Sequence, residues 1–449
     1  MIPINKSGRK NERGVTIVLV AFSLLALLGM AALAIDIATL YVAHGEAQRA
    51  ADAAALAGAK MFAFSGYTSA SATVPAADIC QSGGPGLAAA ANRQAEAVAA
   101  QNQVAGQAAV VQTITCDTTP ANPQIAVTIH RTALPSFFGK IWGGAANSVS
   151  ATAVAEAYNA SGSTAPIQVQ SVKPWLIPNC DPTNGAPGDC AAGGRFVDNA
   201  TGAIQNNGNF VGKTITLTHV AGAAAPNVTP TTPWTLDYYR ANVPMNPPAP
   251  VCPATSAVSC GQVGSDDYHD NIACAATYQF SCGQTVGLGQ AVTVQTGGGL
   301  GVRTNEGTQC LIHASGQGLT LGQDELLPTG GTPTGSAPVT VAGGNNNPNP
   351  ALQGVTSISR SDSIVTVPIY HAAGNPNLCP GGCNQTATIV GFLQLGITQN
   401  LQNGAAPAPG TNGKIEGVIM NVAGCNTGAG GTAVSGGGVS AIPVRLIHQ

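Results

Sequence analysis

Residues 15–35 read VTIVLVAFSLLALLGMAALAI, a run of 21 residues without a charged side chain. About 20 apolar residues in a helix, each rising 1.5 Å, cross a hydrocarbon layer of about 30 Å. A cleaved secretory signal is one alternative, although its apolar part is usually only about 7–15 residues long. A buried helix of a soluble protein is another, but it needs a surrounding core. The sequence therefore predicts a transmembrane helix over residues 14–36 that contacts the lipid bilayer through residues 15–35.

The charges on either side of this run predict its orientation. Four of the 17 lysines and arginines precede it, namely Lys6, Arg9, Lys10 and Arg13. Acidic residues such as Asp36 and Glu46 follow it. Because basic flanks stay in the cytoplasm, we expect residues 1–13 to be a cytoplasmic tail and the rest to be extracytoplasmic. Asp36 is interpreted as the mark of the membrane exit, and pairing with a partner helix is the alternative.

All 12 cysteines lie after the apolar run, and an oxidising compartment favours disulfides between them. The sequence leaves the connectivity open. Near neighbours are the candidate pairs, namely Cys180–Cys190, Cys252–Cys260 and Cys274–Cys282. Cys379 and Cys383 form C-x3-C without a matching second pair, so a metal site there is the weaker alternative. We assign no metal ligand.

Helical sequence continues past the apolar run. Alanine is the best helix former, so one helix from about Val15 to Met61 is expected in spite of Gly45 and Gly58. Small residues recur on one face of it at three- and four-residue spacing, namely Leu40, Ala43, Ala47, Ala50, Ala54 and Ala57. This face fits either a partner helix or the protein's own domain.

The stretch from Glu12 to Ala59 resembles the TadE/TadG-like family of Flp (tight adherence, Tad) pilus-assembly proteins. The resemblance is carried by Glu12-Arg13-Gly14, by Asp36, and by the alanine-rich run from Gln48 to Ala57. Looser similarity continues through residues 134–139 and 149–155.

The resemblance implies a non-enzymatic structural or assembly component of a pilus-like system in the bacterial cytoplasmic membrane. Its helix at 36–60 would contact other pilus or secretion components. Pilin-type members carry Glu at the fifth position after the cleavage glycine. Leu19 stands there in this chain, so we expect the anchor to be retained. The Asp-x-Ser-x-Ser triplet of von Willebrand A-type domains, which larger members carry, is missing from the sequence.

The remaining pattern predicts an α+β protein in which a small α/β unit over residues 37–160 follows the anchor. A helix within 86–106 and strands at 108–115, 125–132 and 148–158 make up this unit. A linker at 161–166 precedes a β-rich extracytoplasmic region at 167–449, expected to be sandwich-like or irregular. Its strand candidates lie at 214–220, 290–296, 337–343, 363–370 and 386–398. Residues 345–349 (NNNPN) are expected to form a loop or a disordered tip.

No pattern of catalytic or cofactor-binding residues emerges, so we expect no enzyme and no cofactor. The cluster Ser265–Asp270 is interpreted as a solvated turn, with a divalent cation site as the alternative. Thr296–Gly301 is glycine-rich but reads as a turn without the strand-to-helix context of a phosphate loop. A net charge of −3 with only 8% charged residues gives no basis for nucleic-acid binding. A membrane-tethered adhesin or glycan-binding module is the alternative function.

Overall fold

The computed structural model describes residues 12–134, 147–161, 167–184, 194–220, 224–244, 267–274, 278–295, 300–313, 324–327, 340–371, 377–379, 382–400, 413–427, 434–435 and 440–447. Its first element is a single helix, α1 (Glu12–Phe64), of 53 residues. The predicted continuous helix is therefore confirmed, and it runs three residues further than Met61. Gly66, which has φ of +72°, ends it and starts the short helix α2 (Tyr67–Ala70). The predicted α+β class, with a long apolar helix and a strand-rich body, is confirmed as well.

The second half of α1 packs on an antiparallel sheet of four strands in the order β20-β5-β4-β3. Three of them are local in sequence, and β20 comes from the far end of the chain; the strands are β3 (Val111–Asp117), β4 (Gln124–Leu134), β5 (Asn147–Ala157) and β20 (Val444–Ile447). Ile125, Val127 and Ile129 alternate into the core, as the sequence predicts. Helix α4 (Ala90–Ala100) packs beside α1.

Six strands of the C-terminal body pair in a closed ring. They are β7 (Trp175–Pro178), β10 (Thr235–Asn242), β8 (Thr214–His219), β18 (Ile415–Gly424), β17 (Thr386–Asn400) and β16 (Ile364–His371), in this spatial order. Each strand pairs with the next, and β16 pairs back to β7. The pairs β10–β8 and β16–β7 are parallel, and the others are antiparallel. The body is therefore a small barrel, and the sandwich expected from the strand pattern is wrong, because β17 and β18 pair and close the sheet.

Alternate residues of the ring strands point to one interior. Trp175, Ile177, Ile215, Leu217, Leu236, Tyr238, Val365, Val367, Ile369, Leu393, Leu395 and Ile397 share one buried cluster. Tyr268 and Ile272 of α5 (Asp267–Ala273) and Leu311 of α6 (Leu300–Leu311) join it. Helices α5 and α6 also pack on each other. Because their side chains belong to the same buried cluster, the two helices cover part of the barrel interior.

The remaining elements are short. Strands β6 (Ile167–Gln170), β11 (Gln279–Ser281) and β19 (Val434–Ser435) form one sheet, and β14 (Glu325–Leu327) and β15 (Thr340–Ala342) another. Strands β9 (Val228–Thr229), β12 (Thr285–Gly287) and β13 (Thr293–Val294) extend the barrel sheet, and β1 (Gln103–Val104) pairs with β2 (Gln107–Ala108). The other helical turns are α3 (Ala76–Ile79), η2 (Pro182–Asn184), η3 (Asn206–Gly208) and η4 (Pro350–Leu352).

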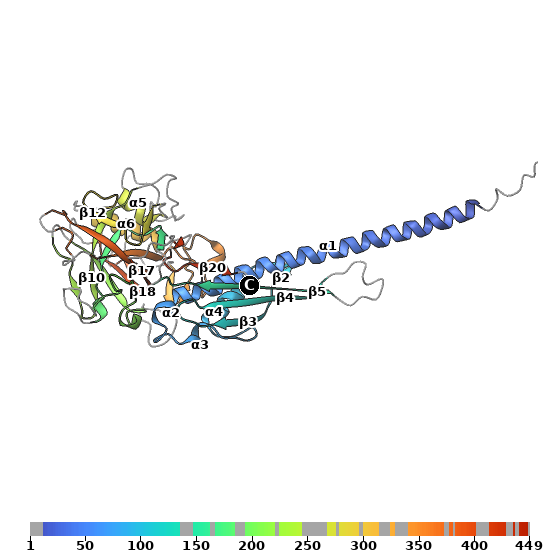
Figure 1. Cartoon of the computed structure of the whole chain (residues 1–449), viewed down its shortest axis with the longest axis horizontal. Helices are drawn as coiled ribbons and strands as arrows, with labels where there is room; N and C mark the ends of the chain where they lie inside the picture. Colours follow the sequence, from blue (N-terminus) through green and yellow to red (C-terminus); the bar gives the residue numbers. More distant parts are fainter. Residues whose placement is uncertain are drawn as a thin grey trace, which may run out of the picture.

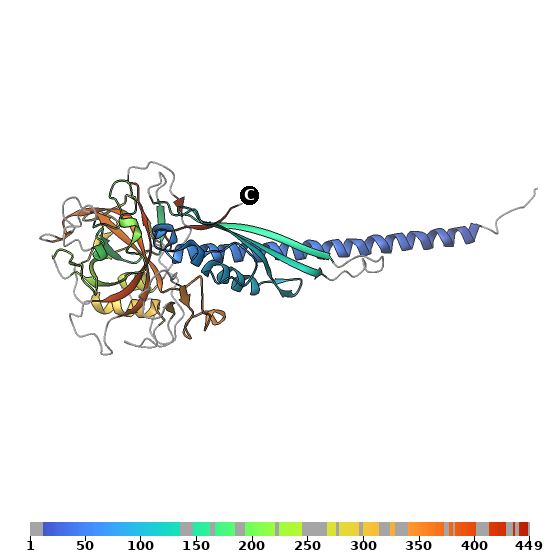
Figure 2. The same ribbon diagram turned by 90° about the horizontal axis from the view of Figure 1, so that it is seen from below.

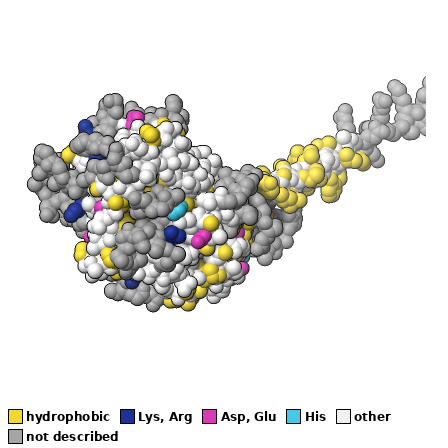
Figure 3. All heavy atoms as spheres, turned by 60° about the vertical axis from the view of Figure 1, so that its left-hand side comes forward, with side chains coloured by type: hydrophobic (Ala, Val, Ile, Leu, Met, Phe, Trp, Pro, Cys, Tyr) yellow, Lys and Arg dark blue, Asp and Glu magenta, His cyan; other side chains and the backbone are white. Residues whose placement is uncertain are grey.

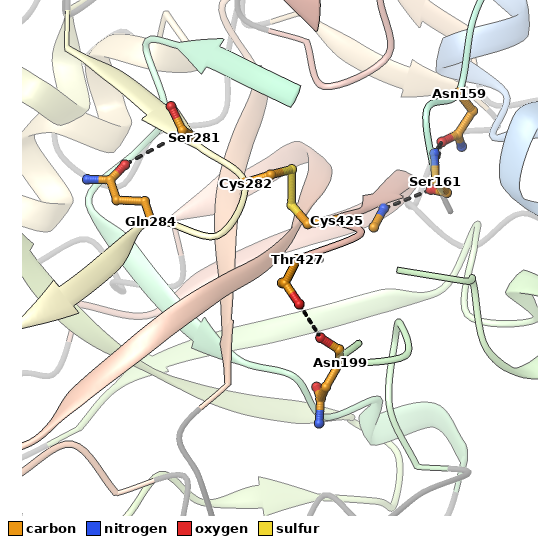
Figure 4. The surroundings of a disulfide bond; sticks show 9 residues. Asn159, Ser161, Asn199, Ser281, Cys282, Gln284, Cys425 and Thr427 are labelled. Carbon is orange, nitrogen blue, oxygen red and sulfur yellow. Dashed lines mark hydrogen bonds between the residues drawn. A yellow bond between two sulfur atoms is a disulfide. The ribbon is translucent and has the colours of Figure 1, made fainter. Parts of the chain in front are cut away.

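Disulfides connect parts of the chain that are distant in sequence. Cys282 pairs with Cys425, at the end of β18, over a separation of 143 residues (Figure 4). The candidate pair Cys274–Cys282 is therefore wrong. Cys80 pairs with Cys116 inside the N-terminal unit. Cys379 pairs with Cys383, and sulfur atoms joined in a disulfide are not thiolates that could bind a metal ion, so the metal alternative for this pair is wrong. Cys180 and Cys274 are also in disulfides, while Cys190, Cys252 and Cys260 lie outside the described residues.

Candidate functional site

The first half of α1 projects from the folded body with its apolar side chains uncovered. Figure 1 shows this part of the helix alone, with the sheet and the barrel gathered at its other end. Ile17 and Phe22 are each 70% exposed, and the other large apolar side chains as far as Ile37 are 48–66% exposed. Figure 3 shows apolar side chains gathered on the projecting helix and a mixed, mostly uncharged face on the body. By length and composition, α1 is able to cross a membrane.

The hairpin of β4 and β5 sets where the folded part begins along α1. It runs beside the helix toward its N-terminal end (Figure 2). Gln48 donates from Nε2 to the carbonyl of Thr152, 3.4 Å away. From Thr152 to Asn147 the strand covers about 17 Å, which equals about eleven helical residues. The end of the described hairpin therefore lies near the level of Ile37, and exposed apolar side chains continue past this level to Tyr41 and Val42.

The small-residue face of α1 is used inside the protein. Ala43, Ala47, Ala50 and Ala54 are buried in the core that α1 shares with β4, β5 and α4. The sequence left open whether this face packs on a partner helix or on the protein's own domain. In the structure these four alanines pack on the protein's own domain. Asp36 is only 7% exposed and has an interaction within the chain, so its side chain is covered by protein atoms. That it marks the membrane exit stays a prediction.

The opposite face of the same helical segment is open. Tyr41 is 81% exposed, and Ile37 and Val42 are also exposed. Gly45 has no atom within 4 Å of the position that a Cβ would take. This exposed face, defined by Ile37, Tyr41, Val42 and Gly45, is the part of residues 36–60 that remains available to another protein.

A buried polar network fixes the end of α1 to the barrel. Asn421 of β18 donates from Nδ2 to the carbonyl of Ala63, 2.6 Å away, and to Thr68 Oγ1, 2.9 Å away. Asn159, just after β5, donates to the carbonyl of Val422 at 3.0 Å. Ser161 accepts from the backbone of Gly424 at 2.7 Å (Figure 4). Because these groups are buried, leaving them unpaired is costly, and the network holds the two units in one orientation.

Ionisable side chains are also buried in the barrel. Lys173 donates to the carbonyls of Ile272 and Cys274 at 2.7 and 3.0 Å, and burial lowers its pKa to about 8. Burial and the nearby Arg240 lower the pKa of His219 to about 3, so His219 is neutral at pH 7. Burial raises the pKa of Tyr238 to about 12. These groups support the barrel and its covering helices, and nothing in the sequence pattern indicated them.

The sequence-predicted polar cluster has a different environment from the one expected. Asp267 starts α5, and His269 and Asp270 are buried with His269 Nδ1 and Asp270 Oδ1 3.0 Å apart. The solvated-turn interpretation is therefore wrong for His269 and Asp270, because the helix turns them into the protein. Asp267 is exposed, and residues 265–266 lie outside the described residues. Within the described ranges, no group of three or more His, Cys, Asp or Glu side chains is placed to hold a metal ion.

The glycine-rich stretch at 296–301 also has a context other than the expected one. Strand β13 ends at Val294 and α6 begins at Leu300, so a strand and a helix do flank it. Residues 296–299 themselves lie outside the described residues. A further pair, His313 and Asp362, lies 49 residues apart in sequence with 3.1 Å between Nε2 and Oδ2. Such a separation gives no local signal, and sequence reasoning missed it.

The fold and the exposed helix define a class of protein, one with an N-terminal apolar helix that continues into an antiparallel α+β unit. Residues 14–61 match the family model described as "Putative Flp pilus-assembly TadE/G-like", so the chain is TadE/TadG-like over this segment. The resemblance seen in the sequence is confirmed there. No curated protein and no solved structure matches the chain.

Proposed function

We propose that this protein is a membrane-anchored, non-enzymatic structural or assembly component of a Flp (Tad) pilus-like system. The observation that carries the proposal is the coincidence of the family match at 14–61 with the exposed apolar half of α1. The same helix anchors the chain through its first half and organises the folded unit through its second half.

We further propose that the N-terminus faces the cytoplasm of the bacterial inner membrane and that the body lies outside it. The basic residues before the helix support this orientation. Disulfides such as Cys80–Cys116 and Cys282–Cys425 support an oxidising compartment for the body. The barrel, with its mostly uncharged surface, would then be presented beyond the membrane at a distance set by the hairpin.

The anchor is tested by placing two charges in the middle of the exposed run. The double variant Leu24→Arg and Leu28→Arg should move the chain from the membrane fraction to the soluble or aggregated fraction. Each arginine at a helix centre costs about 2.5–3.5 kcal/mol on insertion scales. Val110→Arg, at an exposed apolar residue of the folded unit, is the control and should remain in membranes. Membrane retention of the double variant would contradict the proposal.

The partner is tested by photocrosslinking in the native host. A crosslinking residue at Tyr41 lies on the exposed face of α1, and one at Val110 is the control, since both positions are exposed in the free chain. The proposal expects an adduct with another Tad component from position 41 and none from position 110. Adducts only with proteins outside secretion and pilus systems would contradict it. Protease digestion of sealed vesicles, read by a C-terminal tag, tests the orientation separately.

A further inference from the structure

The β4–β5 hairpin extends along α1 toward the part of the helix that is able to cross a membrane. The hydrogen bond from Gln48 to Thr152 fixes one level of β5 against the helix, and the strand runs from there toward the N-terminal end of α1 (Figure 2). Ser148 lies four residues before Thr152, about 14 Å away along the strand, which equals about nine helical residues. Ser148 therefore lies near the level of Thr39.

Arg131 of β4 lies at a similar level. It pairs with Val149 of β5, which is three residues from Thr152. Three strand residues cover about 10 Å, or about seven helical residues, so Arg131 lies near the level of Tyr41. Tyr41 is exposed, and tyrosine is enriched at membrane–water interfaces.

The dimensions of a bilayer place this end of the hairpin among the lipid headgroups. The uncharged run ends at Ile35, and its 21 residues cover the hydrocarbon layer of about 30 Å. A bilayer of about 40–45 Å in all leaves about 5–8 Å for each headgroup layer. The level of Ser148 is about 6 Å beyond Ile35, and that of Arg131 is about 9 Å beyond it. A long arginine side chain can extend from there to the phosphate groups.

Arg131 keeps hydrogen-bonding capacity at this level. Its side chain is partly exposed and donates from Nη2 to Gln107 Oε1, and it forms no ion pair within the described residues. Its Nε is buried without a partner, so the donors left for a ligand are those of the terminal nitrogens. Thr132 and Ser148 are exposed, and their hydroxyl groups can donate to the same kind of acceptor.

The charges around the hairpin favour an anionic partner. The sequence from Gln124 to Ala155, which contains both strands and their connection, has no aspartate or glutamate. The nearest acidic residues of α1 are already engaged within the chain. Asp36 is buried and has an interaction there, and Glu46 Oε2 accepts from the backbone of Ala105 at 2.8 Å. No carboxylate of the described chain therefore competes for Arg131.

We propose that the membrane-proximal end of the β4–β5 hairpin lies in the outer headgroup layer, with Arg131 pairing with the phosphate of an anionic lipid. The proposal rests on the proposed anchoring of the chain by α1. Arginine pairs with phosphate through parallel hydrogen bonds, which give both energy and orientation. The hairpin then provides a second contact with the bilayer beside the helix, and two contacts restrain the tilt of the body relative to the membrane.

The depth of the hairpin is measured by tryptophan quenching in vesicles that contain the full-length chain and brominated phosphatidylcholine. Ser148→Trp is made in a Trp142→Phe background, and the signal of the background alone is subtracted. The new tryptophan should be quenched, because the bromines lie in the hydrocarbon just below its level. Thr152→Trp, on the same strand and equally exposed, lies about 14 Å further from the membrane and should be quenched much less. Leu28→Trp should be quenched most and reports on the anchor itself.

The lipid is identified by replacing brominated phosphatidylcholine with brominated phosphatidylglycerol at the same mole fraction. Quenching of the tryptophan at 148 should indicate a preference of about two- to fivefold for phosphatidylglycerol, as expected for one arginine beside an anionic lipid. Arg131→Gln should abolish this preference, and Arg131→Lys should retain it. Arg49→Gln is the matched control, since Arg49 is exposed on α1 about 21 Å beyond Ile35 and should not affect the preference.

The readouts separate this proposal from the one on which it rests. Quenching at position 28 without quenching at position 148 would mean that the hairpin faces water or another protein, which overturns the proposal and leaves the anchor in place. Equal quenching by the two lipids, or an unchanged preference in Arg131→Gln, would overturn the role of Arg131. Absence of quenching at position 28 would contradict the anchoring of the chain, and the proposal would fail with it.

Discussion

Lys173 places an ammonium group in the interior, where it satisfies carbonyl groups at the end of α5. Its hydrogen bonds to Ile272 and Cys274 close the helix that covers the barrel. Lysine is rarely buried without a carboxylate in contact, and the cost appears as a pKa lowered to about 8. The residue therefore stabilises a local structure while it makes the stability of the whole protein depend on pH.

The sign of this dependence follows from proton binding. Below pH 8 the lysine is charged in both states, so the cost of burying its charge is fully present. Between pH 8 and about 10.5 the unfolded chain keeps a proton that the folded chain has lost, so stability rises with pH. From pH 7.5 to 9.5 we expect a gain of about 1–2 kcal/mol in the free energy of unfolding, measured by urea denaturation.

Lys173→Met is the control for this prediction, because it has no proton to exchange. The difference between wild type and variant should change by the stated amount, while groups shared by both chains, such as Lys60, cancel. Equal pH slopes for the two chains would show that Lys173 is not the group responsible.

The environments of single polar side chains were the feature that the sequence predicted least well. The burial of Asp36 was not predicted, because it depends on protein atoms that cover that face of α1. Asp270 was expected in solvent and lies inside a short helix. His313 and Asp362 meet only after α6 and the segment before β16 have folded together. The environment of a polar side chain depends on tertiary contacts, which neither composition nor periodicity contains.

At the element scale, the end of α1 depends on one glycine. Gly66 has φ of +72°, and an added Cβ would lie 2.4 Å from the carbonyl oxygen of Met420. Gly66→Ala should lower the free energy of unfolding by more than about 2 kcal/mol, since it combines a left-handed backbone with a collision against the barrel. Thermal unfolding followed by circular dichroism measures this change.

Gly45 provides a matched substitution in the same helix. It is helical and exposed, and nothing lies within 4 Å of a Cβ placed there. Gly45→Ala should therefore be neutral or stabilise the protein by about 0.5–1 kcal/mol. The same drop in stability for both alanines would mean that the contact with Met420 does not decide where α1 ends.

Elements with a long periodic pattern were the most predictable. The alanine-rich run predicted α1, and the alternation of Ile125, Val127 and Ile129 predicted β4, because local periodicity determines which face is buried. The candidate strand at 290–296 is reduced to Thr293–Val294, although QAVTVQT has strong β-propensity. Strands β7, β10 and β18 were not predicted as strands, and the closure of β17 on β18 is a pairing between distant segments that no local pattern specifies.

At the scale of the whole molecule, the C-terminal residues pack back on the N-terminal unit. After the barrel, Ala441 and Ile442 are buried in the N-terminal core, and β20 pairs with β5. Arg445 Nε lies 2.6 Å from Glu156 Oε1 across this pair. The N-terminal sheet is therefore complete only when the last residues of the body have been added to it.

This closure, together with the Asn421 network, predicts that the two units unfold as one. Circular dichroism at 222 nm reports mainly on α1 and α4, while tryptophan fluorescence in a Trp142→Phe background reports on the barrel through Trp175 and Trp234. The two thermal transitions should coincide in the full-length chain in detergent. Truncation after Ser440 removes β20 and should lower both midpoints together. Leu446→Ala, at a partly exposed side chain of the same strand, should change them little. Two separate transitions in the intact chain would mean that the anchor unit and the barrel are stable independently, and that the buried contacts between them only position one relative to the other.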